Sequence, residues 1–322
     1  MIADQETNGL MPLEIKNKSL LAKDIFSFEL GRADGSDLPE FTAGAHIAVE
    51  TPSGAMRHYS LTNDPQETHR YVLGIKAERD GRGGSVAMVD SINEGDIVMV
   101  SPPMNEFELL PAPTYILVAG GIGITPIMAM ARQLSRNADI PFQIIYCTRQ
   151  PEFTAFSDEL AGPAFEGKVT IHHDQGDPAN AFDFWDTFAT PTNAHVYCCG
   201  PAPLMEEIRG VTGHWPQTAI HFEDFGAKAG QPKADDKSFV VENSRTGVSY
   251  NVAHDQTIIE ALRAAGEKPP TSCESGTCGT CKTTLIDGDV DHRDMVLMDE
   301  EKSNSIMICV SRARGDKLVL NW

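Results

Sequence analysis

The cysteines near the C-terminal end have a spacing that suits metal chemistry. Cys273, Cys278 and Cys281 lie in the stretch TSCESGTCGTCKTT, and Cys309 follows further along the chain. Thiolate sulfur binds zinc or an iron–sulfur cluster, and paired thiols form disulfides or act as redox dithiols. Four kinds of site therefore compete for this loop: a disulfide staple, a zinc site, a redox dithiol and an iron–sulfur cluster.

The spacing favours the iron–sulfur cluster. The pattern C-x4-C-x2-C with a distant fourth cysteine is that of plant-type 2Fe–2S ferredoxins. Zinc ribbons usually pair two short C-x2-C knuckles, and a dithiol would leave Cys273 and Cys309 without a role. Gly276 and Gly279 would let the backbone approach the cluster sulfurs closely. The predicted cluster ligands are Cys273, Cys278, Cys281 and Cys309, whereas Cys147 and Cys198 are predicted to be buried strand residues.

The composition limits the partners and the compartment. The chain has 322 residues, seven cysteines and a formal net charge of −20 at pH 7. Nucleic acids and anionic membranes attract clustered Lys and Arg, so this charge argues against both; it indicates either solubility or an acidic docking face. The uncharged segment 114–131 contains glycines and a proline, so it predicts a buried strand, a turn and a helix rather than a membrane span. The N-terminal stretch does not resemble a signal peptide, and we expect a cytoplasmic protein.

The hydrophobic pattern divides the chain into three regions. Residues 13–110 contain short strand-sized runs separated by turn residues, which predict an antiparallel barrel or sandwich with one short helix at 83–92. Residues 114–226 alternate strands and helices, as in a parallel α/β sheet that binds ligands at the carboxyl ends of its strands. A segment rich in Gly, Ala, Lys and Asp then leads to a compact α+β unit. We expect domains at 1–111, 112–226 and 238–322, with a linker at 227–237.

Three further motifs point to a family. The segments RHYSL (57–61), GGIGITP (120–126) and YCCGP (197–201), together with the cysteine pattern, resemble the ferredoxin–NADP reductase superfamily. More narrowly, the chain resembles the phthalate dioxygenase reductase family over residues 12–322. The resemblance implies an antiparallel β-barrel that binds FMN, a parallel α/β domain that binds NADH, and a C-terminal β-grasp ferredoxin domain.

The resemblance assigns a flavin site to the first domain. In the R-x-Y-S motif an Arg can pair with the flavin phosphate, a Tyr ring can lie against the isoalloxazine, and a Ser hydroxyl can hydrogen-bond its reactive nitrogen. Glycines at a helix start offer N–H groups to the same phosphate. Taken alone, the tetrapeptide would be read as ordinary strand. The expected flavin residues are Arg57, His58, Tyr59, Ser60, Ile75, Lys76, Gly83, Gly84 and Ser85.

The resemblance likewise assigns a nicotinamide site to the second domain. A strand runs into a glycine turn and a helix, which lets the backbone and the helix N-terminus approach a pyrophosphate. Cys199 matches a cysteine that the family keeps beside the nicotinamide, and Phe225 matches an aromatic residue that covers the flavin. Arg149 would suit a 2′-phosphate, so the preference for NADH rests on the resemblance. The expected residues are Gly120, Gly121, Ile122, Gly123, Thr125, Pro126, Cys199, Gly200, Pro201 and Phe225, with Ser60, Cys199 and Phe225 nearest the reaction.

The function that the resemblance implies is electron transfer. NADH passes a hydride to FMN, the flavin releases its electrons singly to the 2Fe–2S cluster, and a Rieske-type aromatic-ring dioxygenase with a phthalate-like substrate receives them. The protein would be a monomer, and the acidic residues between Asp287 and Glu301 would either dock the oxygenase or form a solvated face. The alternatives are an electron-carrier module, a reductase for another acceptor such as an O-demethylase oxygenase, and a self-sufficient oxygenase. The last lacks an evident haem or iron signature, because the adjacent His172 and His173 would point to opposite faces of a strand.

Overall fold

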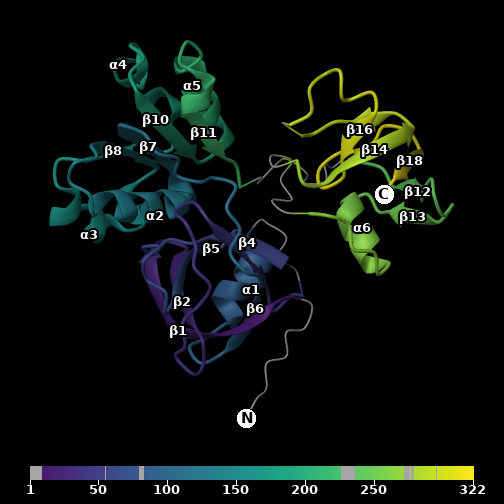
Figure 1. Cartoon of the computed structure of the whole chain (residues 1–322), viewed down its shortest axis with the longest axis horizontal. Coiled ribbons are helices and arrows are strands. Elements are labelled where there is room, and N and C mark those ends of the chain that lie inside the picture. The colour runs from purple at the N-terminus through teal and green to yellow at the C-terminus, as the bar shows by residue number, and fades with distance from the viewer. Residues whose placement is uncertain are drawn as a thin grey trace. The chain divides into compact units, whose positions relative to one another are not determined.

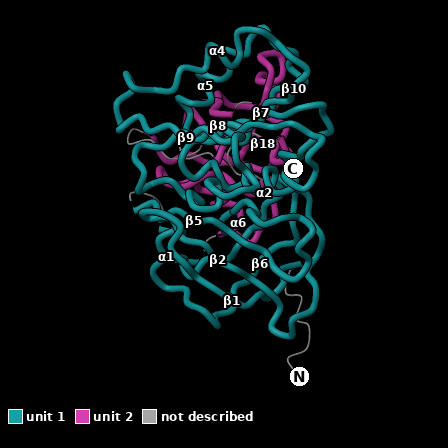
Figure 2. The backbone as a smooth tube through the Cα atoms, turned by 90° about the vertical axis from the view of Figure 1, so that its left-hand side faces the viewer, with its two compact units in different colours: residues 1–223 teal, residues 224–322 magenta. Residues whose placement is uncertain are grey.

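The chain folds into two compact units, Met1–Glu223 and Asp224–Trp322, which are coloured separately in Figure 2. The structure is a computed structural model that describes residues 9–54, 56–79, 83–225, 236–271, 276, 279–294 and 296–322. Figure 1 shows two β-rich layers in the first unit, and a separate mixed sheet with one helix in the second.

The first layer of the first unit is a six-stranded antiparallel sheet in the order β4-β3-β6-β1-β2-β5. A bridge between Leu61 and Leu73 joins the ends of the two outer strands, so the sheet curls toward a barrel. Alternate residues of β1, such as Leu13 and Ile15, enter a core that includes Phe28 and Tyr71. The elements are β1 (Met11–Ala22), β2 (Ile25–Gly31), β3 (His46–Glu50), β4 (Met56–Ser60), β5 (Tyr71–Lys76), α1 (Gly84–Ser91) and β6 (Ile97–Val100).

The second layer is a five-stranded parallel sheet in the order β11-β10-β7-β8-β9. Its strands β7 and β8 are almost fully buried because helices cover both faces. The helix α2 packs on one face with barrel residues, while α4 and α5 pack on the other. The strands are β7 (Thr114–Gly120), β8 (Phe142–Thr148), β9 (Val169–His173), β10 (Ala194–Cys199) and β11 (Ile220–Glu223); the helices are α2 (Ile124–Ser135), α3 (Ser157–Leu160), α4 (Trp185–Phe188) and α5 (Ala202–Val211).

Short 3-10 turns complete this layer at Gly121–Gly123, Pro151–Phe153, Pro163–Phe165, Pro178–Asn180 and Gln217–Ala219. The uncharged segment 114–131 forms β7, the first of these turns and the start of α2, as the sequence predicts. Among the residues that the structure describes, no helix is long and apolar enough to cross a membrane.

The second unit is a mixed five-stranded sheet in the order β13-β12-β18-β14-β16, with a separate β15–β17 ribbon. Strands β12 and β18 run parallel, and the other pairs are antiparallel. The helix α6 begins with a capping box between Thr257 and Glu260 and buries Ile258 and Leu262 in the core of the unit. The elements are β12 (Phe239–Asn243), β13 (Ser249–Val252), α6 (Ile258–Ala264), β14 (Lys282–Asp287), β15 (Val290–Asp291), β16 (Ser305–Met307), β17 (Arg312–Ala313) and β18 (Lys317–Asn321).

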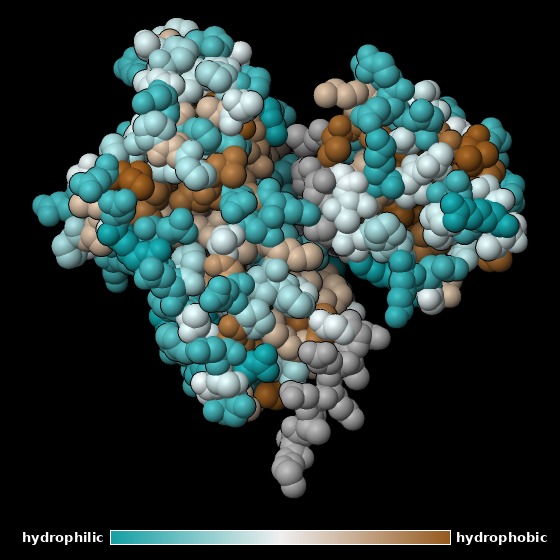
Figure 3. Space-filling view, in the orientation of Figure 1, coloured by the Kyte–Doolittle hydropathy of each residue, from teal (hydrophilic) through white to brown (hydrophobic). Residues whose placement is uncertain are grey.

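The predicted fold class is confirmed: an antiparallel barrel-like sheet, a parallel α/β sheet and an α+β unit follow one another along the chain. The exact domain boundaries stay a prediction. Residues 227–235 of the expected linker lie outside the described residues, and Asp236 and Lys237 belong to the second unit. Hydrophilic residues cover most of the face in Figure 3, and hydrophobic residues form small groups between them.

Candidate functional site

The first part of the site joins strand β4 to the start of helix α1. A Cβ built at Gly84 would lie 2.8 Å from Nε and 3.1 Å from Cγ of Arg57, so the Arg57 side chain lies directly against the first turn of α1. Gly83 precedes the helix with a φ of 82°, in the left-handed region that favours glycine. A guanidinium beside unsatisfied helix N–H groups is a suitable pair of donors for a phosphate. The arrangement therefore fits a flavin phosphate.

Tyr59 has a buried hydroxyl that lacks a hydrogen-bond partner among the described residues. Burial raises its pKa to about 12, although the nearby Arg57 charge opposes the shift, so the hydroxyl is neutral at physiological pH. A buried hydroxyl without a partner costs free energy unless a ligand supplies one. This orphan group is a second observation that fits a bound flavin beside β4.

The remaining residues of the predicted flavin site lie near this strand, but not all face a ligand. Ser60 is buried at the end of β4, and His58 stacks on His46 with ring centroids 5.0 Å apart. The Ile75 side chain is fully buried in the barrel core, so contact with a ligand would have to come from its backbone.

Two polar residues of the predicted flavin site close the end of β5. Lys76 pairs with Glu78 at 2.5 Å, and the hydroxyl of Ser85 accepts a 3.1 Å hydrogen bond from the Glu78 N–H. Glu78 therefore ties the end of β5 to the first turn of α1, which keeps the predicted flavin residues of both elements together.

The second part of the site forms where β7 and β10 end side by side. A Cβ at Gly120 would lie 2.6 Å from Cδ of Pro201, and a Cβ at Gly123 would overlap the carbonyl group of Cys199. The motifs GGIG and CGP therefore touch backbone to backbone. Gly121, at a φ of +53°, has open space on its Cβ side, where a pyrophosphate can approach the turn.

Two hydroxyls fix the shape of this glycine turn. Thr125 donates to the carbonyl of Ile122 at 3.0 Å. Tyr146 of β8 donates to the carbonyl of Gly121 at 3.1 Å, and its hydroxyl also accepts from the N–H of Ala155. Pro126 is buried in α2, where its fixed φ suits the first helical turn. Tyr146 was not predicted, because a tyrosine inside a strand carries no local signal of such a bond.

Cys199 ends β10 and is completely buried in the core between the sheet and the barrel. Its side chain has no exposed surface, so the predicted contact with nicotinamide would need a local movement. Phe225 follows β11 in the second unit and is 42% exposed. Its predicted contact with the flavin stays a prediction.

The residues at the carboxyl ends of β8 and β9 are not part of the glycine turn. His173 Nδ1 lies 2.8 Å from the Thr148 hydroxyl, and His172 Nε2 lies 2.7 Å from the carbonyl of Asn180. The two histidines therefore do not share a site, as the sequence predicts. Arg149 is exposed directly after β8.

The predicted cluster ligands fall partly within the described residues. Cys281 and Cys309 are both buried in the core of the second unit, whereas Cys273 and Cys278 lie outside the described residues. Gly276 has a φ of +77°, and a Cβ there would lie 2.8 Å from Cγ2 of Val310. Gly276, between two of the predicted ligands, therefore packs against the residue that follows Cys309, which fits four cysteines around one cluster. With two of the four ligands undescribed, no group of three or more metal-binding side chains occurs in the described part.

Cys198 of β10 is buried, as predicted, whereas Cys147 of β8 is only partly buried. Burial raises both pKa values to about 12, with a smaller contribution from Asp174 for Cys147. Both lie in strands of the first unit, whereas Cys281 and Cys309 lie in the core of the second unit, which supports their exclusion from the predicted ligand set.

Part of the acidic stretch of the second unit forms ion pairs within the chain. Asp299 pairs with Lys302, Glu301 with Lys282, and Asp291 with Arg293. The Asp294 carboxylate accepts hydrogen bonds from the N–H groups of Val296 and Leu297. These contacts favour a solvated face that the unit itself stabilises over a docking face.

Comparisons with known proteins agree with this arrangement. Three family models match in order: an oxidoreductase FAD-binding domain over residues 12–109, an oxidoreductase NAD-binding domain over 117–210, and a 2Fe-2S iron-sulfur cluster binding domain over 241–314. The chain is 52% identical to the phthalate 4,5-dioxygenase oxygenase reductase subunit of Pseudomonas putida, over 99% of both chains. It is 50% identical to the phthalate dioxygenase reductase of Burkholderia cepacia, over 100% of both.

Solved structures give the same result. A phthalate dioxygenase reductase structure superposes with a TM-score of 0.89 at 50% identity, covering 98% of both chains. An intact type IV self-sufficient cytochrome P450 monooxygenase matches with a TM-score of 0.73 at 35% identity, over 99% of this chain and 43% of that one.

Proposed function

Because this chain belongs to the phthalate dioxygenase reductase family, we propose that its electron acceptor is a Rieske-type dioxygenase with a phthalate-like aromatic substrate. The chain is an NADH-dependent oxidoreductase whose cofactors are FMN and a 2Fe–2S cluster, and an oxygenase component is its partner. The observation that carries the proposal is the full-length identity of 50–52% to two reductases of phthalate dioxygenases.

The contacts described above support the following roles for the predicted site residues. A bound flavin takes a hydride from NADH and releases electrons singly to a cluster that carries one at a time. Arg57 and the start of α1 hold the flavin phosphate, and Tyr59 hydrogen-bonds the flavin. The turn at Gly120–Gly123 and the start of α2 hold the pyrophosphate of NADH, and Cys199 and Pro201 lie at the nicotinamide end. No side chain needs to act as an acid or base, so the protein contributes position and electrostatics.

The cluster ligands and Phe225 complete the assignment. Cys273, Cys278, Cys281 and Cys309 hold the cluster, as their spacing indicates. Phe225 covers the flavin and yields to nicotinamide when NADH binds.

A second acceptor class is represented among the relatives. Vanillate O-demethylase oxidoreductases from two Pseudomonas strains are 38% and 40% identical to this chain. The identity to the phthalate systems is higher by ten percentage points or more and extends over more of the chain. This difference favours a phthalate-like dioxygenase over an O-demethylase as the partner.

We also propose a compartment and an assembly state. Two buried thiols and four cluster cysteines suit a reducing compartment, which supports a cytoplasmic location. The mostly hydrophilic face in Figure 3 supports a monomer. Light scattering of the purified protein should give the mass of one chain, and the mass of a dimer would contradict this assignment.

The test of the proposed function is spectroscopic and then catalytic. The purified protein should show flavin and iron–sulfur absorption, release FMN on denaturation, and bleach with NADH under anaerobic conditions. Mixed with a phthalate dioxygenase and phthalate, it should support dihydroxylation faster than it supports a vanillate O-demethylase. A colourless protein, or one that is not bleached by NADH, would refute the reductase function. Faster support of the O-demethylase would refute the assigned acceptor alone.

A further inference from the structure

Helix α2 lies between the parallel sheet and the barrel, as Figures 1 and 2 show. Its buried face includes Ile127 and Met130, and the same core cluster contains Ile25 and Phe107 of the barrel layer. The helix begins at the glycine turn assigned to NADH, and its far end approaches the loop that follows the flavin strand β4. It therefore contacts both halves of the reaction site.

The first end of α2 is held by a close contact with the barrel. Gly74 of β5 lies so near to Thr125 that a Cβ at position 74 would be 2.7 Å from Thr125 Cγ2. The φ of Gly74 is not in the left-handed region, so backbone conformation does not require glycine there. Glycine is needed at position 74 because the lack of a side chain lets β5 lie close to α2. The next two residues of β5, Ile75 and Lys76, belong to the assigned flavin site.

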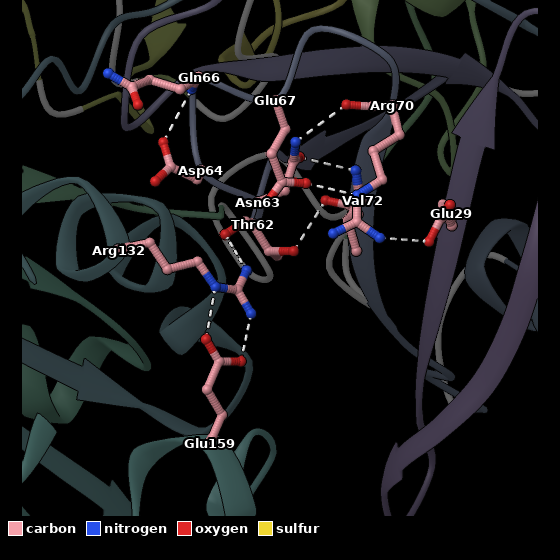
Figure 4. Close-up of polar contacts among 10 residues, drawn as sticks. All are labelled: Glu29, Thr62, Asn63, Asp64, Gln66, Glu67, Arg70, Val72, Arg132 and Glu159. Atoms are coloured by element: carbon pink, nitrogen blue, oxygen red, sulfur yellow. Dashed lines mark hydrogen bonds and ion pairs between the residues drawn. The ribbon is translucent and has the colours of Figure 1, made fainter. Parts of the chain in front are cut away.

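The other end of α2 is held by Arg132, as Figure 4 shows. Arg132 donates to the carbonyl of Thr62 and to both carboxylate oxygens of Glu159, the latter at 2.8 and 2.5 Å. Its guanidinium also lies 5.4 Å from the ring centroid of Phe156. One turn further on, Arg136 pairs with Asp64.

The loop that receives Arg132 is itself tied to β5. The Thr62 hydroxyl donates to the Val72 carbonyl at 3.0 Å, and the Asn63 side chain bonds the Arg70 carbonyl and the Val72 N–H. Thr62 comes two residues after Ser60 of the assigned flavin site. Arg132 thus connects α2 to both flavin strands through one loop.

We infer that Gly74 and Arg132 are positioning residues that set the separation between the NADH turn and the flavin strands. Gly74 sets the distance at the start of α2, and Arg132 holds its far end against the β4–β5 loop. Hydride transfer requires near-contact geometry, and an error of about 1 Å can cost about 100-fold in rate. This inference rests on the proposed function, since it concerns the flavin and NADH that the function requires.

The first test is a double-mutant cycle at the Gly74–Thr125 contact. Gly74→Ala adds the methyl group, and Thr125→Ser removes Cγ2 but keeps the hydroxyl that bonds Ile122. Single-turnover reduction of the flavin by NADH should slow by about 10- to 100-fold in Gly74→Ala. The added methyl group should cost less than about threefold when it is introduced into Thr125→Ser. Equal losses in both backgrounds, or no loss, would overturn the role of Gly74.

A second readout does not depend on turnover. A non-reducing dihydronicotinamide analogue should produce a long-wavelength charge-transfer band with the wild-type flavin, because this band requires contact between the rings. Gly74→Ala should weaken the band while flavin content and analogue affinity change little. If Gly74→Ala retains a band of wild-type intensity, the inference fails even where the rate is lower.

The second test concerns Arg132. Arg132→Met should slow flavin reduction about tenfold or more with a small change in NADH affinity. Arg132→Lys should recover part of the rate because a lysine can bond one of the two partners, Thr62 or Glu159. The control is Lys23→Met, which removes the exposed Lys23–Glu152 pair between the same two layers and should leave the rate within about twofold. If Arg132→Met has a lower melting temperature but an unchanged rate of flavin reduction, Arg132 contributes only to stability and its positioning role is wrong. Should Arg132→Met fail to fold, a wild-type rate in Arg132→Lys would likewise overturn its role.

The two levels of proposal fail differently. If NADH does not reduce the wild-type flavin, the proposed function fails. If NADH reduces the wild type and the variants at the same rate, the function stands and only the positioning inference fails.

Discussion

Arg293 donates two hydrogen bonds to the carboxylate of Asp236, at 2.8 and 2.5 Å, inside the second unit. Only 9% and 7% of these side chains are exposed, and Arg312 lies 3.3 Å from the same carboxylate. The sequence places Asp236 in the expected linker, but this ion pair fixes it to the cluster-binding unit. Arg312 follows the predicted cluster ligand Cys309 by three residues. The ion pairs of Asp236 with Arg293 and Arg312 therefore connect the residues before β12 to the segment that contains Cys309.

Replacing Asp236 by Asn should destabilise the second unit strongly. The change leaves two buried guanidinium groups beside a neutral amide, and breaking a buried ion pair costs about 3–5 kcal/mol. Urea unfolding of the holoprotein, followed by the visible absorption of the cluster, should show the loss. The control is Glu242→Gln, which removes the more exposed pair with Lys317 and should cost about 0.2–1 kcal/mol. Equal losses in the two variants would contradict the argument.

The capping box of α6 predicts a smaller effect. Thr257 Oγ1 accepts the Glu260 N–H at 3.2 Å, and the Glu260 carboxylate accepts the Thr257 N–H at 2.9 Å. Thr257→Ala should lower the free energy of unfolding of the second unit by about 1 kcal/mol, whereas Thr257→Ser should keep most of it. Chemical unfolding of both variants measures the difference. A serine variant as unstable as the alanine variant would mean that the cap bond contributes little.

Cys309→Ser should remove the cluster without removing the flavin. The hydroxyl of serine is a poor replacement for a thiolate ligand of iron. Cys309 lies in the second unit, whereas the predicted flavin residues of β4, β5 and α1 lie in the first. The measurement is iron and FMN per chain, with the visible spectrum. Cys147→Ser is the control and should keep its iron, because Cys147 lies in β8 of the first unit and is not a predicted ligand. Loss of iron in the control would show that the ligand assignment is wrong.

The sequence predicts those parts of this structure that depend on local pattern. The runs at β7, β8 and β10 are mostly apolar strands, and the glycine turn and the helix start of α1 are marked by their own residues. The ferredoxin cysteines are recognised by spacing alone. Apart from the distant Cys309, each of these signals is complete within about ten residues.

Local pattern does not predict an element whose polar residues are stabilised by contacts with residues far away in the sequence. The strand β1 was not picked out, because Lys16, Asn17 and Lys18 interrupt its apolar pattern. The structure shows why Lys18 is tolerated: its ammonium donates to the carbonyls of Val89 and Ile92 at the end of α1.

Two contacts at the site were missed for a similar reason. The Gly74–Thr125 and Tyr146–Gly121 contacts join residues from different segments, so neither residue of a pair signals the other.

The buried thiol of Cys198 predicts a loss of stability at alkaline pH. Burial raises its pKa from 9.0 to about 12, so between these values the unfolded chain loses a proton that the folded chain keeps. This contribution to stability is full below pH 9 and is lost as the pH rises toward 12. Cys198→Ala should make the fall of unfolding free energy shallower by up to about 1.4 kcal/mol per pH unit. Urea unfolding of the first unit at about pH 8 and about pH 10.5 tests this, and parallel pH dependences in the two proteins would contradict it.

Gly123→Ala should damage NADH binding, because the turn at Gly120–Gly123 and the end of β10 touch backbone to backbone. The new Cβ would overlap the Cys199 carbonyl and lie 2.8 Å from the Gly200 nitrogen, and no flexible side chain is available to move away. Overpacking of this kind costs about 1–3 kcal/mol, and the displaced turn should raise the KM for NADH. Gly210→Ala is the matched control: Gly210 lies within α5 with no heavy atom within 4 Å of its Cβ position, so alanine should stabilise the first unit by about 0.5–1 kcal/mol. Thermal unfolding measures the stability of both variants, and titration with NADH measures their affinity. A Gly123→Ala protein with wild-type NADH affinity would mean that the contact between Gly123 and Cys199 does not shape the nucleotide site.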